Sequence, residues 1–93
     1  MFTPRYKELR IEPTIKAMRE LLHNNSDLSD VVEVLENGHN CSPSQRAENI
    51  IEKCMRKSNI ETRVVVAKIK IRYTDGFAEE VWRLIHFGIV KVR

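Results

Sequence analysis

The chain has 93 residues, of which 42% are hydrophobic and 31% are charged, and a formal net charge of +3. This length suits a single domain, residues 1–93, with a thin core. No apolar run approaches the ~20 residues of a membrane span, and charged residues interrupt the start where a signal segment would lie. We therefore expect a cytoplasmic protein without a membrane partner.

The charge is unevenly distributed along the chain. Residues 26–61 carry four Lys/Arg against seven Asp/Glu, whereas residues 62–93 carry seven against three. A basic C-terminal third favours a phosphate-bearing or acidic partner, although an ordinary solvated sheet face explains the same charge.

The two cysteines, Cys41 and Cys54, are thirteen positions apart. In a cytoplasmic chain we expect reduced thiols rather than a disulfide. With His39 and His86 they would supply four zinc ligands by residue type, but their spacing matches no common zinc module. The sequence therefore predicts no metal site and no cofactor.

The first half of the chain predicts a helical hairpin over residues 13–37. Residues 1–13 fit a short helix or an extended arm equally well. A helix is expected over 13–23, with an apolar face formed by Ile15, Met18, Leu21 and Leu22. A second helix ends at Asn37, where Gly38 would take the left-handed conformation of a C-terminal cap.

The second half contains one clear strand and two ambiguous segments. Residues 63–73 alternate as a half-buried strand, which places Lys68, Lys70 and Arg72 together on one face. Residues 45–57 show a helical apolar stripe that favours a helix over the strand alternative. Residues 77–87 fit either state; a strand is favoured because 63–73 needs a partner beyond the turn at 74–76. In that strand Arg83 and His86 would lie on opposite faces.

His86 is the residue with the clearest chemical interest. It lies in the most apolar run of the chain, where a core histidine is the ordinary explanation, yet it is the one group in the basic region able to exchange a proton near neutral pH. With Arg46, Glu52 and Lys68 it would complete a metal-free ribonuclease. Such an enzyme needs a base for the ribose 2′-hydroxyl, an acid for the leaving oxygen and cations for the developing charge.

Several short segments carry a resemblance to a known group of proteins. They are VLENG at 34–38, Arg46, IEKC at 51–54, VVV at 64–66 and EVWRLIHFG at 80–88. Together they resemble small archaeal and bacterial proteins that are similar to the RelE/ParE/BrnT toxin superfamily, over roughly residues 28–90.

The resemblance implies an α+β fold in which two N-terminal helices pack on a twisted antiparallel β-sheet over about 46–92. It thereby favours strands for both ambiguous segments and replaces the helix at 45–57. Toxin members of this superfamily cleave messenger RNA and are neutralised by an antitoxin. Positions that would carry such activity here are Arg46, Glu52, Lys53 and His86. The chain is less basic than a ribosome-directed toxin, and fold alone does not establish function.

Three hypotheses follow from these observations. The first is an RNA-acting domain with His86, Glu52 and Arg46 as catalytic residues and Lys53, Lys68, Lys70 and Arg72 as nucleic-acid contacts. The second is a module of the same fold that binds protein or nucleic acid without catalysis. The partners expected are RNA and, from the resemblance, an antitoxin-like protein. The third is a homodimer that pairs through a strand edge.

Overall fold

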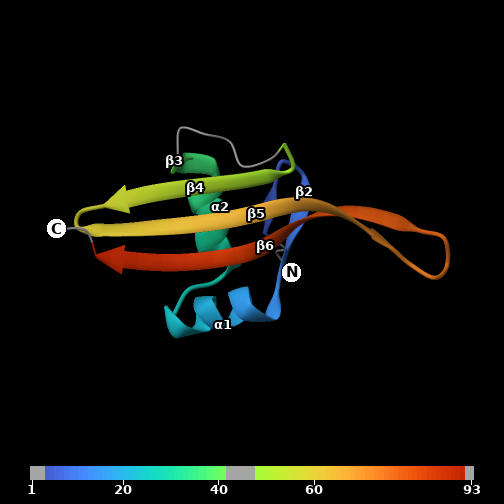
Figure 1. Cartoon of the computed structure of the whole chain (residues 1–93), viewed down its shortest axis with the longest axis horizontal. Coiled ribbons are helices and arrows are strands. Elements are labelled where there is room, and N and C mark those ends of the chain that lie inside the picture. Colours follow the sequence, from blue (N-terminus) through green and yellow to red (C-terminus); the bar gives the residue numbers. More distant parts are fainter. Residues whose placement is uncertain (1–3, 42–47, 92–93) are drawn as a thin grey trace.

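The computed structural model describes residues 4–41 and 48–91 and contains two helices and a six-stranded sheet (Figure 1). The sheet order is β1-β2-β6-β5-β4-β3, and both helices lie between β2 and β3 in the chain. The bounds are β1 Arg5–Tyr6, β2 Leu9–Pro13, α1 Ile15–His23, α2 Leu28–Asn37, β3 His39–Asn40, β4 Ile50–Lys57, β5 Ile60–Arg72 and β6 Ala78–Lys91.

The predicted fold class, two N-terminal helices on an antiparallel sheet, is wrong because the sheet is not antiparallel throughout. β2 pairs in parallel with β6, so the sheet is mixed. The N-terminal segment, for which no single state was predicted, adds β1 and β2 to that sheet. These two strands are joined through Lys7 and Glu8, which have φ values of 48° and 71°. A turn with two left-handed residues normally uses Asn or Gly, so a turn at Lys7 and Glu8 has no recognisable sequence signal.

The strands predicted in the C-terminal half are confirmed. β4, β5 and β6 form an antiparallel meander, so the strand assignment holds in both ambiguous segments. Ile51 and Met55 of β4 pack against the core from within the meander. This tertiary packing outweighs the helical stripe of the segment. Residues 42–47, including the start of the ambiguous segment, lie outside the described part of the chain.

The helices and the sheet share one apolar core. Val64 and Val66 of β5 and Leu84 and Phe87 of β6 pack with buried residues of both helices. We call this face of the sheet the helix side. The opposite face is called the open face, although Val65 and Ala67 on it are themselves buried, with exposures of 4% and 7%. Because β5 alternates, Lys68, Lys70 and Arg72 continue the helix side beyond the helices.

The face of α1 that is buried differs from the prediction. Ala17 and Leu21 are buried, whereas Ile15 and Leu22 are 75% and 72% exposed and Met18 is also exposed. α1 lies alongside β6 at the edge of the sheet (Figure 1) and packs against it through few residues. A contact this narrow buries two residues of α1, whereas the sequence predicts a broader apolar face for residues 13–23.

Gly38 is required for close packing rather than for a left-handed cap. Its φ is −80°, so the predicted left-handed conformation is wrong. A Cβ at this position would lie 2.5 Å from the carbonyl oxygen of Val34 and 2.7 Å from that of Cys54. Glycine thus lets the end of α2 approach the β4 backbone.

The two cysteines form a disulfide, so the prediction of reduced thiols is wrong. Cys41 follows β3, and Cys54 lies in β4 with a Cα–Cα distance of 5.2 Å. The β3–β4 pairing places His39 opposite Cys54, which brings the two cysteines within bonding distance. The bridge fastens the short β3 to the body of the sheet.

Candidate functional site

A bulge in β6 determines which way His86 points. Val66 of β5 pairs with Leu84, whereas Val65 pairs with His86, so Ile85 is an extra residue in β6. The extra residue changes the alternation of the strand. Arg83 and His86 therefore both lie on the open face, and the prediction of opposite faces is wrong.

His86 is held by a carboxylate from α1. Its Nδ1 lies 2.9 Å from Oε2 of Glu20, and the other carboxylate oxygen, Oε1, accepts a hydrogen bond from the backbone N–H of Phe87 at 3.2 Å. Both side chains are partly exposed, 38% for His86 and 24% for Glu20. A carboxylate on Nδ1 fixes the orientation of an imidazole and directs Nε2 away from it.

The Nε2 atom of His86 lies over Gly88. A Cβ built at Gly88 would be 3.0 Å from this atom, so glycine provides the room in which the ring lies. Arg63 of β5 pairs with Gly88 across the sheet, and its side chain is half exposed. The guanidinium of Arg63 lies 3.8 Å from Oε1 of Glu61. An oriented imidazole can exchange a proton, and a guanidinium on the neighbouring strand can hold an anion.

The second group of functional interest is a row of cations on a projecting hairpin. The ends of β5 and β6, residues 68–81, extend beyond the helices (Figure 1); we call them the arm. Lys68, Lys70 and Arg72 are exposed on its helix side, and within the described residues none of them has a carboxylate within 4.0 Å. Glu80 is opposite Lys70 in register without forming such a pair.

Aromatic residues lie at both ends of this row. At its base the rings of Tyr6 and Trp82 are 5.7 Å apart, and Nζ of Lys68 lies 5.8 Å from the centre of the Trp82 ring. At the tip of the arm Phe77 is 73% exposed and Tyr73 is 44% exposed. Cations with exposed aromatic rings are the features that bind single-stranded nucleic acid.

The cations on the other face are paired. Arg10 contacts Glu79 at 2.8 Å and Glu12 at 3.2 Å, and Arg83 contacts Glu12 at 2.7 Å. The hydrogen bond from Arg83 lowers the pKa of Glu12, and those from Arg10 and then Tyr73 lower the pKa of Glu79. The same Glu79 contact raises the pKa of Arg10. These charges neutralise one another, whereas Lys68, Lys70 and Arg72 on the helix side have no such pairing among the described residues.

The structure separates most of the predicted catalytic residues. Glu52 and His86 both pair with Val65 from opposite sides, so they share the open face but lie two strands, about 10 Å, apart. Lys53 and Lys68 are on the helix side. Arg46 lies outside the described residues.

The nucleic-acid contacts predicted from the sequence lie in two places. Lys68, Lys70 and Arg72 form the row on the arm, whereas Lys53 is in β4, paired with Val64 near the helices. Sequence reasoning missed Glu20, Arg63 and Phe77. Nothing in the sequence marks Glu20, because its contact with His86 joins residues 66 positions apart. Phe77, however, could have been recognised as an apolar residue beside a turn.

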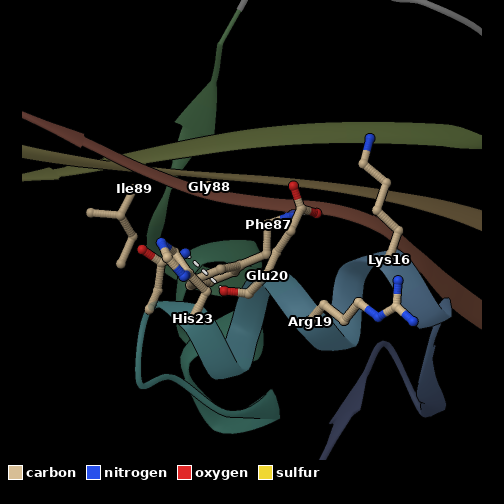
Figure 2. Close-up of a pocket in the computed structure, with 8 residues that line it drawn as sticks. Lys16, Arg19, Glu20, His23, Phe87, Gly88 and Ile89 are labelled. Atoms are coloured by element: carbon tan, nitrogen blue, oxygen red, sulfur yellow. Dashed lines mark hydrogen bonds between the residues drawn. The ribbon is translucent and has the colours of Figure 1, made fainter.

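A hollow adjoins the His86 region between α1 and the end of β6. It has a volume of 620 Å³ and is lined by Lys16, Arg19, Glu20, His23, Asn24, Phe87, Gly88 and Ile89. Figure 2 shows Lys16 and Arg19 on one side of Glu20 and His23 on the other, all projecting from α1. The rim is thus basic, while Glu20 is engaged by Phe87 and His86.

Among residues 4–41 and 48–91, no three His, Cys, Asp or Glu side chains cluster in a way that could hold a metal ion. Neither helix has the length and apolar character needed to span a membrane.

Comparison of the chain with protein-family models, curated proteins and solved structures found no match. The resemblance to the RelE/ParE/BrnT superfamily therefore stays a prediction.

Proposed function

We propose that this protein binds single-stranded RNA through the helix side of the arm. The observation that carries the proposal is the row of Lys68, Lys70 and Arg72, which are exposed and have no carboxylate partner among the described residues. Arg10 and Arg83, on the opposite face, are neutralised by glutamates. Unpaired cations are the ones available to replace the counterions of a phosphate backbone.

The spacing and shape of the arm support an extended ligand. Alternate residues of a strand are about 6.7 Å apart, so the three cations form a straight line of about 13 Å. Phe77 at the tip offers a ring face on which a base can stack. Two strands standing away from the body of the protein leave this line accessible along its whole length (Figure 1).

The test is a fluorescence anisotropy titration with a labelled single-stranded RNA. The variant Lys68→Gln/Lys70→Gln/Arg72→Gln should lose most of the binding. A control with the same change in charge, Lys16→Gln/Arg19→Gln/Lys91→Gln, should keep it. Equal loss in both variants would show attraction to net charge alone and contradict the proposal. Single-stranded DNA of the same sequence, titrated in parallel, measures whether the ribose hydroxyl contributes.

A second candidate function, metal-free RNA cleavage, is favoured by one geometric observation. Glu20 orients His86 through Nδ1, and Arg63 lies across the sheet from the glycine under the ring. In this proposal His86 exchanges the proton and Arg63 holds the phosphate, whereas Glu52 has no direct part. The partner predicted from the resemblance, an antitoxin-like protein, belongs with this candidate.

Cleavage is tested with purified protein and mixed-sequence RNA in EDTA. His86→Ala and Glu20→Gln should both abolish cleavage, whereas His23→Ala should not. Intact RNA after incubation with the wild-type protein would contradict the cleavage proposal and leave RNA binding without catalysis as the proposed function.

The cytoplasmic location is part of this proposal, since that is where messenger RNA would be met. The Cys41–Cys54 disulfide argues against a cytoplasmic location, because such bridges are rare in a reducing cytoplasm. Thiol alkylation followed by mass spectrometry of protein taken from cells gives the state of the pair.

A further inference from the structure

The outer edge of β6 is covered over only part of its length. Its inner edge pairs with β5 along the whole strand, Ala78 to Lys91. Its outer edge pairs with β2 only at Trp82, Arg83 and Leu84. Beyond the end of β2 the carboxylate of Glu20 accepts the Phe87 N–H. The rest of the edge, towards Lys91, has no strand partner among the described residues.

The free backbone groups of this segment can be assigned from the alternation of the strand. Since the Phe87 N–H points outward to Glu20, the groups of residues two and four positions later also point outward. These are the N–H and C=O of Ile89 and the N–H of Lys91, in addition to the C=O of Phe87. A row of unpaired donors and acceptors on a regular strand is a template for another strand.

The hollow described above lies directly against this edge. Phe87, Gly88 and Ile89 form one wall of its 620 Å³, and α1 forms the other (Figure 2). A peptide strand lying beside β6 would therefore enter an existing space instead of displacing α1.

The charge around the hollow indicates what kind of strand fits. Lys16, Arg19 and His23 project from α1 around it, and its one carboxylate, Glu20, is already engaged. A second copy of this chain, paired about a two-fold axis, would bring Lys16 and Arg19 of both copies to the same interface. Like charges at such an interface disfavour self-pairing, whereas carboxylates on an incoming strand would be attracted.

We propose that an extended acidic segment of a partner protein adds to the outer edge of β6 at residues 87–91. Its backbone would exchange hydrogen bonds with Phe87, Ile89 and Lys91, and Asp or Glu side chains at alternate positions would face Lys16 and Arg19. Backbone pairing gives affinity in this mode of recognition, and the alternate side chains give specificity. The site is separate from the row of cations on the arm and does not depend on RNA binding.

The probe is a fluorescein-labelled seven-residue peptide that alternates Val and Glu. Its binding is measured by anisotropy, and hydrogen exchange of the Ile89 amide is followed by NMR. We expect saturable binding that slows exchange at Ile89. Lys16→Glu/Arg19→Glu should weaken binding about tenfold, as expected for reversing two exposed charge contacts. The matched control Lys68→Glu/Lys70→Glu should change it less than about twofold.

A peptide N-methylated at alternate residues separates strand addition from charge attraction. It keeps the carboxylates but loses the donors that face β6, so it should not bind. The proposal would be overturned if the unmodified peptide did not bind, or if the methylated peptide bound equally well. It would also be overturned if Lys68→Glu/Lys70→Glu weakened peptide binding as much as Lys16→Glu/Arg19→Glu, or if single-stranded RNA displaced the peptide. A dimer in analytical ultracentrifugation that itself protects the Ile89 amide would also overturn it, because a second copy would then occupy the edge.

Discussion

His86 reaches Glu20 because a single extra residue, Ile85, changes the alternation of β6. Without the bulge, the histidine would follow the pattern that the sequence predicts and would not share a face with Arg83. The bulge also explains why Ile85 is exposed in an otherwise apolar strand. A local insertion of this kind leaves no clear mark in the hydrophobic pattern, and it determines the geometry of the candidate site.

The close approach at Gly38 leads to a first prediction. Gly38→Ala should lower the free energy of unfolding by about 2 kcal/mol, because the new Cβ would press on two backbone carbonyls that cannot rotate away. Gly88→Ala is the matched control. Its Cβ would meet only the His86 ring, which can move, so a smaller loss is expected. Urea unfolding of both variants measures the difference, and equal losses would contradict the packing role given to Gly38.

The paired charges on the open face lead to a prediction about acid. The pKa values of Glu12 and Glu79 are held below the ordinary value of 4.5, so the unfolded chain takes up protons before the folded one does. Their contribution to stability is complete above pH 4.5 and is lost as the pH falls through the lowered values. Arg10→Gln should therefore reduce the fall in Tm on acidification from pH 6 to pH 3.

Arg72→Gln is the control for this acid effect, because it removes an equal charge that has no carboxylate within 4.0 Å among the described residues. Its Tm should fall with acid as steeply as that of the wild-type protein. Identical pH profiles for the wild-type protein and Arg10→Gln would show that the network does not contribute.

Among the elements, β3 depends most on a single covalent bond. It has two residues and is attached to the sheet by its pairing with β4 and by the Cys41–Cys54 bridge. Closing a loop of this length restricts the unfolded chain by about 3 kcal/mol in the chain-entropy account. Cys41→Ala/Cys54→Ala should lower the free energy of unfolding by a similar amount.

Reduction distinguishes the bridge from the side chains that form it. Dithiothreitol should destabilise the wild-type protein by nearly the same amount and leave the double variant unchanged. A wild-type urea midpoint that does not respond to reduction would contradict a structural role for the bridge.

The elements differ in how far the sequence predicts them. The residue pattern over 63–73 predicted the strand state of β5 and that Lys68, Lys70 and Arg72 share one face. It did not show that this face packs against the helices at Val64 and Val66 or that Val64 to Ala67 are all buried. β1 and β2 were missed because each is short and their turn uses Lys7 and Glu8 in place of Asn or Gly. α1 was predicted at nearly the right position, but of its predicted apolar face Leu21 is buried whereas Ile15, Met18 and Leu22 are exposed. Its packing partner is the sheet edge, and periodicity within the helix cannot show that.

The sequence predicts only the part of the candidate site that lies within a single strand. The row of Lys68, Lys70 and Arg72 is visible in the sequence because it lies within one strand. The pairing of His86 with Glu20 brings together α1 and β6, which are far apart in the chain, and no local rule relates them. Glu52 was a plausible partner by residue type, but the sheet order places β5 between it and His86.

At the scale of the whole molecule, the two proposed surfaces lie at opposite ends of an elongated body with principal extents of 51, 31 and 22 Å. The arm forms one end, and the open edge of β6 beside α1 lies towards the other (Figure 1). RNA and a protein partner could therefore be bound together. The partner would meet α1, and the RNA would meet the row of cations.

The salt dependence of RNA binding tests the central claim most directly. Three phosphate contacts to a single strand predict that log K falls against log salt concentration with a slope of about −2. In Lys68→Gln/Lys70→Gln/Arg72→Gln the slope should approach zero, whereas Lys16→Gln/Arg19→Gln/Lys91→Gln should retain the wild-type value. A slope that is unchanged in the arm variant would place the phosphates elsewhere and contradict the account.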